Sequence, residues 1–131
     1  MRGLLLVGVM SAAVFCGCVK NDGPVPVTGT VKYPDGSIPA GEVCDVRFER
    51  EGGKMARGVI GADGTFKLTT MEPDDGAFPG QYKVCLEVFK TYMGRESVVA
   101  PEFEKMSTTP LNADVKRGDK NHFDFVVKPR P

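Results

Sequence analysis

The sequence predicts an all-β domain, an antiparallel sandwich or barrel of six or seven short strands. Apolar and polar residues alternate with a period of two along most of the chain, which is the pattern of half-buried strands. The 16 glycines and 10 prolines punctuate these segments at turns, and a helical protein would not tolerate so many. No window carries the apolar period of an amphipathic helix. One flat layer of strands would leave an apolar face wet, so we expect two packed sheets.

The strands are expected in order between residues 25 and 127. The predicted segments are 25–33, 43–50, 56–60, 65–70, 82–90, 111–115 and 123–127. The pair Asp63-Gly64 between two alternating segments is a strong hairpin signal. Residues 92–110 show no period, and we expect a long loop there with short structure inside.

Two positions within these strands carry specific expectations. Gly29 lacks a side chain in mid-strand, which predicts the close approach of a neighbouring strand or a bulge. Tyr82 follows Pro79-Gly80, and we expect its ring in the core and its hydroxyl bonded to loop backbone.

The first segment is typical of an export signal. Arg2 supplies the positive charge that such a signal carries at its start, and residues 3–15 form the uncharged apolar stretch that follows. The segment ends in Phe15-Cys16-Gly17-Cys18, where the chain resembles a bacterial lipoprotein precursor. Such precursors place a bulky apolar residue three before the modified cysteine and a small residue directly before it, as Phe15 and Gly17 do for Cys18. We predict a lipoprotein signal peptide over residues 1–17, lipidation at Cys18, and a tether over residues 18–24.

Two other fates of this segment stay open. The uncharged stretch from residue 3 to residue 19 approaches the length of about 20 residues that a membrane span needs, so it would serve as an uncleaved anchor. Cleavage by an ordinary signal peptidase would instead release a secreted protein. A doubly acylated cysteine would hold the chain firmly on the membrane. Val19 stands where an inner-membrane retention signal would place Asp, which favours the outer membrane, facing the periplasm or the cell surface.

Three stretches carry a resemblance to a known family. Residues 27–31, 61–66 and 79–84 (VTGTV, GADGTF and PGQYKV) resemble a carboxypeptidase-regulatory-like domain. Residues 109–111 and 123–125 resemble the end of small lipoproteins of that kind in planctomycete-like bacteria. The resemblance covers residues 25–128 and implies a seven-strand antiparallel Greek-key sandwich of the transthyretin (prealbumin) type. It implies an accessory or binding module at the cell surface and carries over no catalytic residues.

The cysteines invite one further expectation. If Cys16 leaves with the signal and Cys18 is lipidated, Cys44 and Cys85 remain as an even pair in an oxidising compartment, which invites a disulfide. Alternation nevertheless places Cys44 on the core face of its strand and Cys85 on the outer face of its own. A bridge would require a bulge or a different register.

Little in the sequence points to chemistry. The 17 Lys and Arg balance 17 Asp and Glu, which argues against a nucleic-acid partner. The single histidine, His122, is expected on the surface beside Asp124, opposite the neighbouring aromatic residues. The acidic stretch 72–76 lacks the spacing of a calcium loop, and the mixed aromatic and basic stretch 89–95 is expected to cover the end of the sheet. We expect no metal and no cofactor.

These observations favour a lipid-anchored, extracytoplasmic binding or scaffolding module that is not an enzyme. Its partners would be the membrane, through the N-terminal lipid, and an envelope protein or glycan. One alternative is an adhesion or assembly subunit that pairs through a strand edge. Another is a carbohydrate-binding module, which the absence of Trp disfavours.

Overall fold

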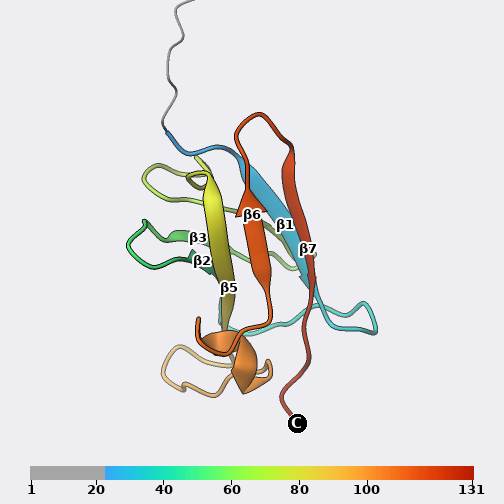
Figure 1. The fold of residues 1–131 in the computed structure, drawn as a ribbon. Coiled ribbons are helices and arrows are strands. Elements are labelled where there is room, and N and C mark those ends of the chain that lie inside the picture. The colour runs from blue at the N-terminus through green and yellow to red at the C-terminus, as the bar shows by residue number, and fades with distance from the viewer. Residues whose placement is uncertain (1–22) are drawn as a thin grey trace, which may run out of the picture.

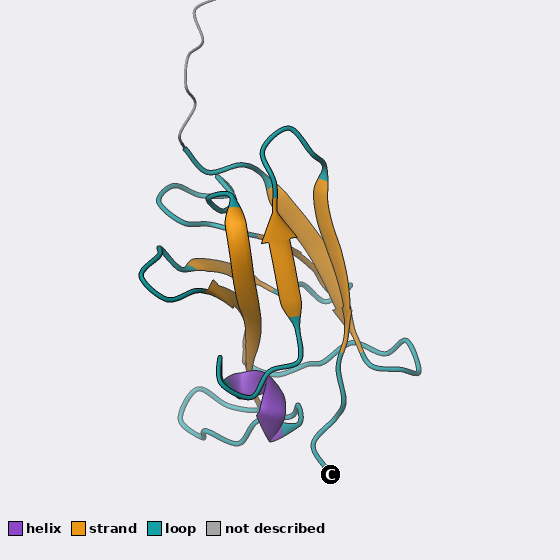
Figure 2. Ribbon diagram, in the orientation of Figure 1, coloured by secondary structure: helices purple, strands orange, loops and turns teal. Residues whose placement is uncertain are grey.

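The computed structural model describes residues 23–131 and shows an all-β fold of two facing sheets (Figures 1 and 2). The smaller sheet has the order β4-β1-β7 and the larger sheet the order β3-β2-β5-β6. The strands of the described chain are β1 (Val27–Lys32), β2 (Val43–Glu49), β3 (Ala56–Val59), β4 (Thr65–Lys67), β5 (Gly80–Phe89), β6 (Asn112–Val115) and β7 (Asn121–Val126). Each predicted segment overlaps one of these strands. The two sheets confirm the two-sheet expectation.

One pairing differs from the expected antiparallel arrangement. β1 and β7 run parallel, with Val27 opposite Asn121 and Lys32 opposite Val126. The other strand pairs are antiparallel. The chain leaves β6 in the larger sheet, turns through residues 116–120 and enters β7 in the smaller sheet, so β7 reaches β1 from across the sandwich. Alternation determines which face a side chain takes but not the direction in which two strands meet, and the expectation was wrong for this pair.

The two long sides of the sandwich differ. On one side β3 and the segment after β4 are joined, because Arg57 and Thr69 exchange backbone hydrogen bonds of 2.9 and 2.7 Å. On the other side, within the described chain, β6 pairs with β5 alone and β7 with β1 alone. The outer edges of β6 and β7 therefore carry no further strand of this chain.

The core between the sheets is built around Phe48. Its ring centroid lies 5.8 to 6.2 Å from those of four aromatic neighbours, Phe66, Tyr82, Phe123 and Phe125. Edge-to-face and tilted contacts of this kind add to the stabilisation from burial. Gly29 of β1 makes room for these rings, since a Cβ there would lie 2.3 Å from the Phe123 carbonyl oxygen and 2.4 Å from the Phe66 ring. The predicted close approach at Gly29 is confirmed.

The stretch between β5 and β6 is a long loop that contains the 3-10 helix η1 (Pro101–Glu104), as expected for residues 92–110. η1 packs against β5 and buries Phe103. No helix among residues 23–131 has the length and apolar character that crossing a membrane requires.

Candidate functional site

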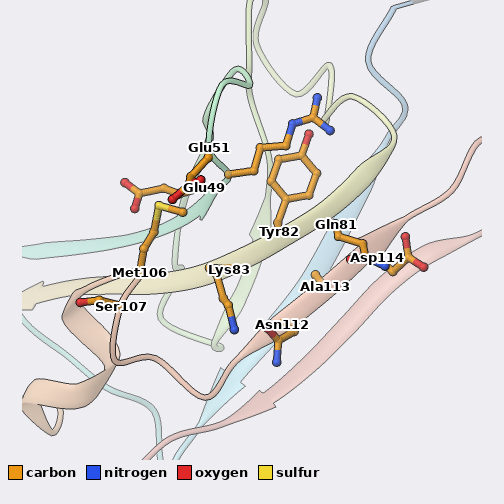
Figure 3. Close-up of a pocket in the computed structure, with 11 residues that line it drawn as sticks. Glu49, Glu51, Gln81, Tyr82, Lys83, Met106, Ser107, Asn112, Ala113 and Asp114 are labelled. Atoms are coloured by element: carbon orange, nitrogen blue, oxygen red, sulfur yellow. The ribbon is translucent and has the colours of Figure 1, made fainter.

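An open groove on the outer face of the larger sheet is the candidate binding site. It has a volume of about 900 Å³ above β2, β5 and β6 (Figure 3). Its lining is mainly charged or amide side chains: Glu49, Glu51, Gln81, Lys83, Asn112 and Asp114. We call this set of residues the outer groove.

Strand register explains how these side chains meet. In β5, Tyr82 and Val84 turn into the core, so Gln81 and Lys83 point outward. Lys83 lies opposite Glu49 on β2 and opposite Asn112 on β6, while Gln81 lies opposite Asp114. Three strands thus present a row of carboxylate, ammonium and amide groups at the spacing of neighbouring strands, about 4.8 Å.

Two loops form the walls of the outer groove. One wall is the turn after β2, which contains Arg50 and Glu51. The other wall is formed by Met106 and Ser107, which follow η1. Arg50 is fixed in place because its Nη1 donates a 3.0 Å hydrogen bond to the Pro79 carbonyl. Gly80 leaves space for this side chain, since a Cβ at Gly80 would lie 2.0 Å from Arg50 Nη1.

An ion network lies beside the outer groove. Arg47 Nη1 is 3.4 Å from Glu49 Oε1 and 3.0 Å from Glu87 Oε1, and Arg47 Nη2 donates to the Glu104 carbonyl at 3.4 Å. The Cys85 thiol donates to Glu49 Oε2 over 3.7 Å. Glu49 therefore has one oxygen toward Arg47 and the other toward Cys85, which orients its carboxylate at the groove.

This arrangement supports binding through hydrogen bonds and charge. The outer groove offers an ammonium and amide donors at its centre, and carboxylate acceptors at its rim. Such a surface recognises a polar ligand by the pattern of its donors and acceptors. Among residues 23–131, His, Cys, Asp and Glu side chains form no cluster of three or more that could hold a metal ion.

The predicted lipidation site lies elsewhere in the chain. Cys18, the signal peptide over residues 1–17 and most of the tether fall outside the residues that the structure describes. The described part begins at Gly23, whose carbonyl accepts a 2.6 Å hydrogen bond from Arg117 Nη2. The start of the sandwich is thereby fastened to the turn between β6 and β7 (Figure 1).

Cys44 and Cys85 are both free thiols in the structure. Cys44 lies opposite Val88 and packs against the core, while Cys85 lies opposite Arg47 on the outer face. The two cysteines are thus on opposite faces and three register positions apart, and no bridge joins them. Cys85 is fully buried although it points outward, on the strand that η1 packs against. Burial and the nearby Glu49 carboxylate raise the pKa of the Cys85 thiol to about 11.

His122 lies where the alternation predicts, exposed on the outer face of the smaller sheet. Its Nδ1 is 2.8 Å from Thr28 Oγ1, and its Nε2 is 3.0 Å from Asp124 Oδ1. Both contacts are satisfied when Nε2 donates to Asp124 and Nδ1 accepts from the Thr28 hydroxyl. Asp124 also accepts a 2.6 Å hydrogen bond from the Thr30 hydroxyl, and this bond, with the nearby His122, lowers the pKa of the carboxyl.

The two remaining stretches also have defined structure. In the acidic stretch 72–76, Asp75 accepts backbone N–H groups of Thr70, Met71 and Glu72 at 2.7 to 3.0 Å, so its carboxylate closes its own loop. In the stretch 89–95, Tyr92 and Met93 are 77% and 97% exposed.

Sequence reasoning did not single out the outer groove. Its residues alternate with core positions as any exposed strand residues do, and only the β2-β5-β6 register brings them into one row. The available signal was the outward position of Gln81 and Lys83 in the longest strand.

The fold and the outer groove define an all-β, two-sheet module with a candidate binding surface on its larger sheet. Comparison of the chain with protein-family models, with curated proteins and with solved structures gives no match.

Proposed function

We propose that the chain is a lipid-anchored binding or scaffolding module of the cell envelope, held at the outer membrane through Cys18. The outer groove is the observation that carries the binding part of the proposal. A row of outward-facing charged and amide groups with two loop walls is suited to an envelope protein or glycan. The lipoprotein pattern at residues 15–18 supports the anchor.

We further propose that the sandwich is a Greek-key, transthyretin-like domain over residues 25–128. Three features support this: seven strands in two facing sheets, the first strand beside the last, and repeated passage of the chain between the sheets. Backbone pairing runs from Val25, which bridges Ala77, to Pro129, which bridges Val99. A fold of this breadth supports many functions, so the function rests on the surface rather than on the architecture.

The anchor is tested by mass spectrometry of the N-terminus of the full chain expressed in a Gram-negative host. We expect a mature chain that begins with acylated Cys18, and a Cys18→Ala variant without the lipid mass. An intact Met1 or an unmodified mature N-terminus would contradict the anchor.

The binding surface is tested by placing a photo-crosslinking residue at Lys83 in the outer groove. The matched control is the same residue at Lys67, an exposed lysine on the outer face of the smaller sheet. We expect an envelope-derived adduct at position 83 that is absent at position 67. Equal labelling at both positions would reject the outer groove as the binding surface.

A second candidate function is an assembly subunit that pairs through a strand edge. The observation that favours it is the pair of edges at β6 and β7, to which the described chain adds no further strand.

A further inference from the structure

The outer edge of β7 has the features of a pairing surface. Val127, directly after β7, donates its N–H to the Lys32 carbonyl of β1. Because backbone groups alternate sides along a strand, Phe123 and Phe125 also direct their N–H and C=O groups toward β1. His122, Asp124 and Val126 direct theirs away from β1, toward solvent.

This edge is the longer of the two that the described chain leaves without a strand. β7 has six residues, whereas β6 has only four and begins shortly after Pro110. Val126 is 61% exposed on the outer face of β7, so its side chain is available to a paired strand. Phe123 is only partly buried, although it belongs to the aromatic core.

We propose that the β7 edge pairs with the β7 edge of a second copy of this chain, antiparallel and about a two-fold axis at Phe123. A two-fold interface brings residue i to j and j to i. Pairing with the axis at Phe123 places His122 opposite Asp124 of the second copy, and Asp124 opposite its His122. The two sheets then join as β4-β1-β7-β7-β1-β4.

Charge selects this register over its neighbour. A shift of the axis to Asp124 would set two carboxylates directly opposite each other, which is destabilising. With the axis at Phe123, each Asp124 instead faces His122 of the second copy, which within its own chain bonds Asp124 over 3.0 Å, and Val126 lies against the aliphatic stem of Lys120. The two Phe123 residues then form the non-hydrogen-bonded central pair, where side chains approach most closely, and bury the part of each ring that the single chain leaves exposed.

This inference gives the edge and the partner for the second candidate function, and it does not depend on the lipid anchor or on the outer groove. Sedimentation velocity of the detergent-solubilised full chain, with a Cys18→Ala chain run in parallel, therefore separates it from the anchor proposal. We expect a reversible dimer with both chains. A chain that is monomeric at 100 μM in both forms would overturn the inference.

Three variants test the register. In His122→Asp, the new carboxylate faces Asp124 of the second copy, and we expect the dimer dissociation constant to rise at least tenfold. The exchange variant His122→Asp/Asp124→His restores opposite partners, and we expect its dissociation constant to return to within about threefold of the original. Lys67→Glu, on the far edge of the same sheet, is the control and should leave dimerisation unchanged. An equal effect of His122→Asp and Lys67→Glu, or no recovery in the exchange variant, would overturn the proposal.

A cross-link provides a second measurement that does not require a fully stable dimer. Residues of a hydrogen-bonded antiparallel pair have Cα atoms about 5.5 Å apart, within the range that a disulfide spans. Mixing a His122→Cys chain with an Asp124→Cys chain should give a disulfide-linked heterodimer, identified by peptide mass. Either variant alone should not link at these positions. A cross-link that forms equally well in each variant alone would contradict the register.

Discussion

Arg50 lies over the ring of Tyr82, with its guanidinium carbon 4.8 Å from the ring centroid. Arg50 also donates to the Pro79 carbonyl, and the Tyr82 hydroxyl donates to the Phe78 carbonyl at 2.6 Å. Both side chains thereby donate hydrogen bonds to carbonyl groups of the turn before β5. This contact links the wall of the outer groove to the aromatic core, since Tyr82 also packs against Phe48.

Tyr82→Phe is expected to destabilise the fold by about 1 kcal/mol, because it removes one buried hydrogen bond and keeps the ring. The measurement is the denaturant midpoint of unfolding. Tyr92→Phe is the matched control, since Tyr92 is largely exposed, and its midpoint should not change. An unchanged midpoint in Tyr82→Phe would reject the role of the hydroxyl.

Phe48→Ala is expected to reduce the free energy of unfolding by about 3–5 kcal/mol, the range for removal of a large buried ring. The ring contacts aromatic residues of both sheets, so its loss leaves a cavity between them. Phe48→Leu should be much milder because it keeps most of the volume. Denaturant unfolding measures both, and similar losses in the two variants would argue against the central position of Phe48.

Gly29→Ala is expected to destabilise the fold by about 3 kcal/mol, because the new methyl group would overlap the Phe123 carbonyl and the Phe66 ring. Gly36→Ala is the comparison: Gly36 has a φ of +87° and open space around it, so we expect only about 1 kcal/mol of backbone strain. The thermal midpoint distinguishes them. A Gly29→Ala variant as stable as Gly36→Ala would show that β1 and β7 can separate without loss.

Asp75 should make stability depend on acid pH. Burial opposes ionisation of its carboxyl, but hydrogen bonds from the backbone of Thr70, Glu72 and Met71 outweigh it and lower the pKa. A lowered folded-state pKa stabilises the fold above the unfolded value of about 3.9, and this stabilisation is lost as pH falls through the folded pKa. Asp75→Asn should therefore be less stable at pH 7, by about 1 kcal/mol in this partly exposed loop.

The difference between Asp75→Asn and the unsubstituted chain should shrink as the pH is lowered below 3.9. Glu51→Gln, a charge change on an exposed residue, serves as the control and should leave the pH profile as it is. A difference that is constant from pH 7 to pH 2.5 would show that the Asp75 charge has no part in closing the loop.

The thiols should react in a fixed order. Burial raises the pKa of Cys44 as well as that of Cys85, but only Cys85 is fully enclosed. With maleimide at pH 8 and no reductant, we expect modification of Cys44 in the folded chain and of Cys85 only after unfolding. Peptide mass spectrometry identifies the modified residue. If neither cysteine reacts in denaturant, a disulfide joins them and the opposite-face arrangement is wrong.

The sequence was sufficient for the strands and for the face of most side chains. Alternation placed Tyr82 and Val84 in the core and Lys83 outside, because a strand has a fixed period of two. Turn residues such as Gly64, with a φ of +83°, marked the ends of strands. These properties depend on residues that are close together in the sequence, so a short stretch of sequence is enough to predict them.

The remaining features depend on contacts that no short window contains. The parallel union of β1 and β7 joins residues 94 positions apart, as the Thr28–His122 contact shows. Alternation correctly places Cys85 on the outer face but does not predict that it is fully buried there. The outer groove likewise depends on the register of three strands, which tertiary packing sets.

The pairing of β1 with β7 also affects when the domain can fold during its synthesis. A ribosome or an export channel delivers the chain from the N-terminus, so β1 is available long before the residues that complete its sheet. Long-range pairing of this kind is slow to form. Until Val126 has emerged, the edge of β1 that pairs with Phe123 and Phe125 has no partner strand. We therefore expect the domain to reach its native state only after β7 has been delivered, so that residues 121–126 complete the fold.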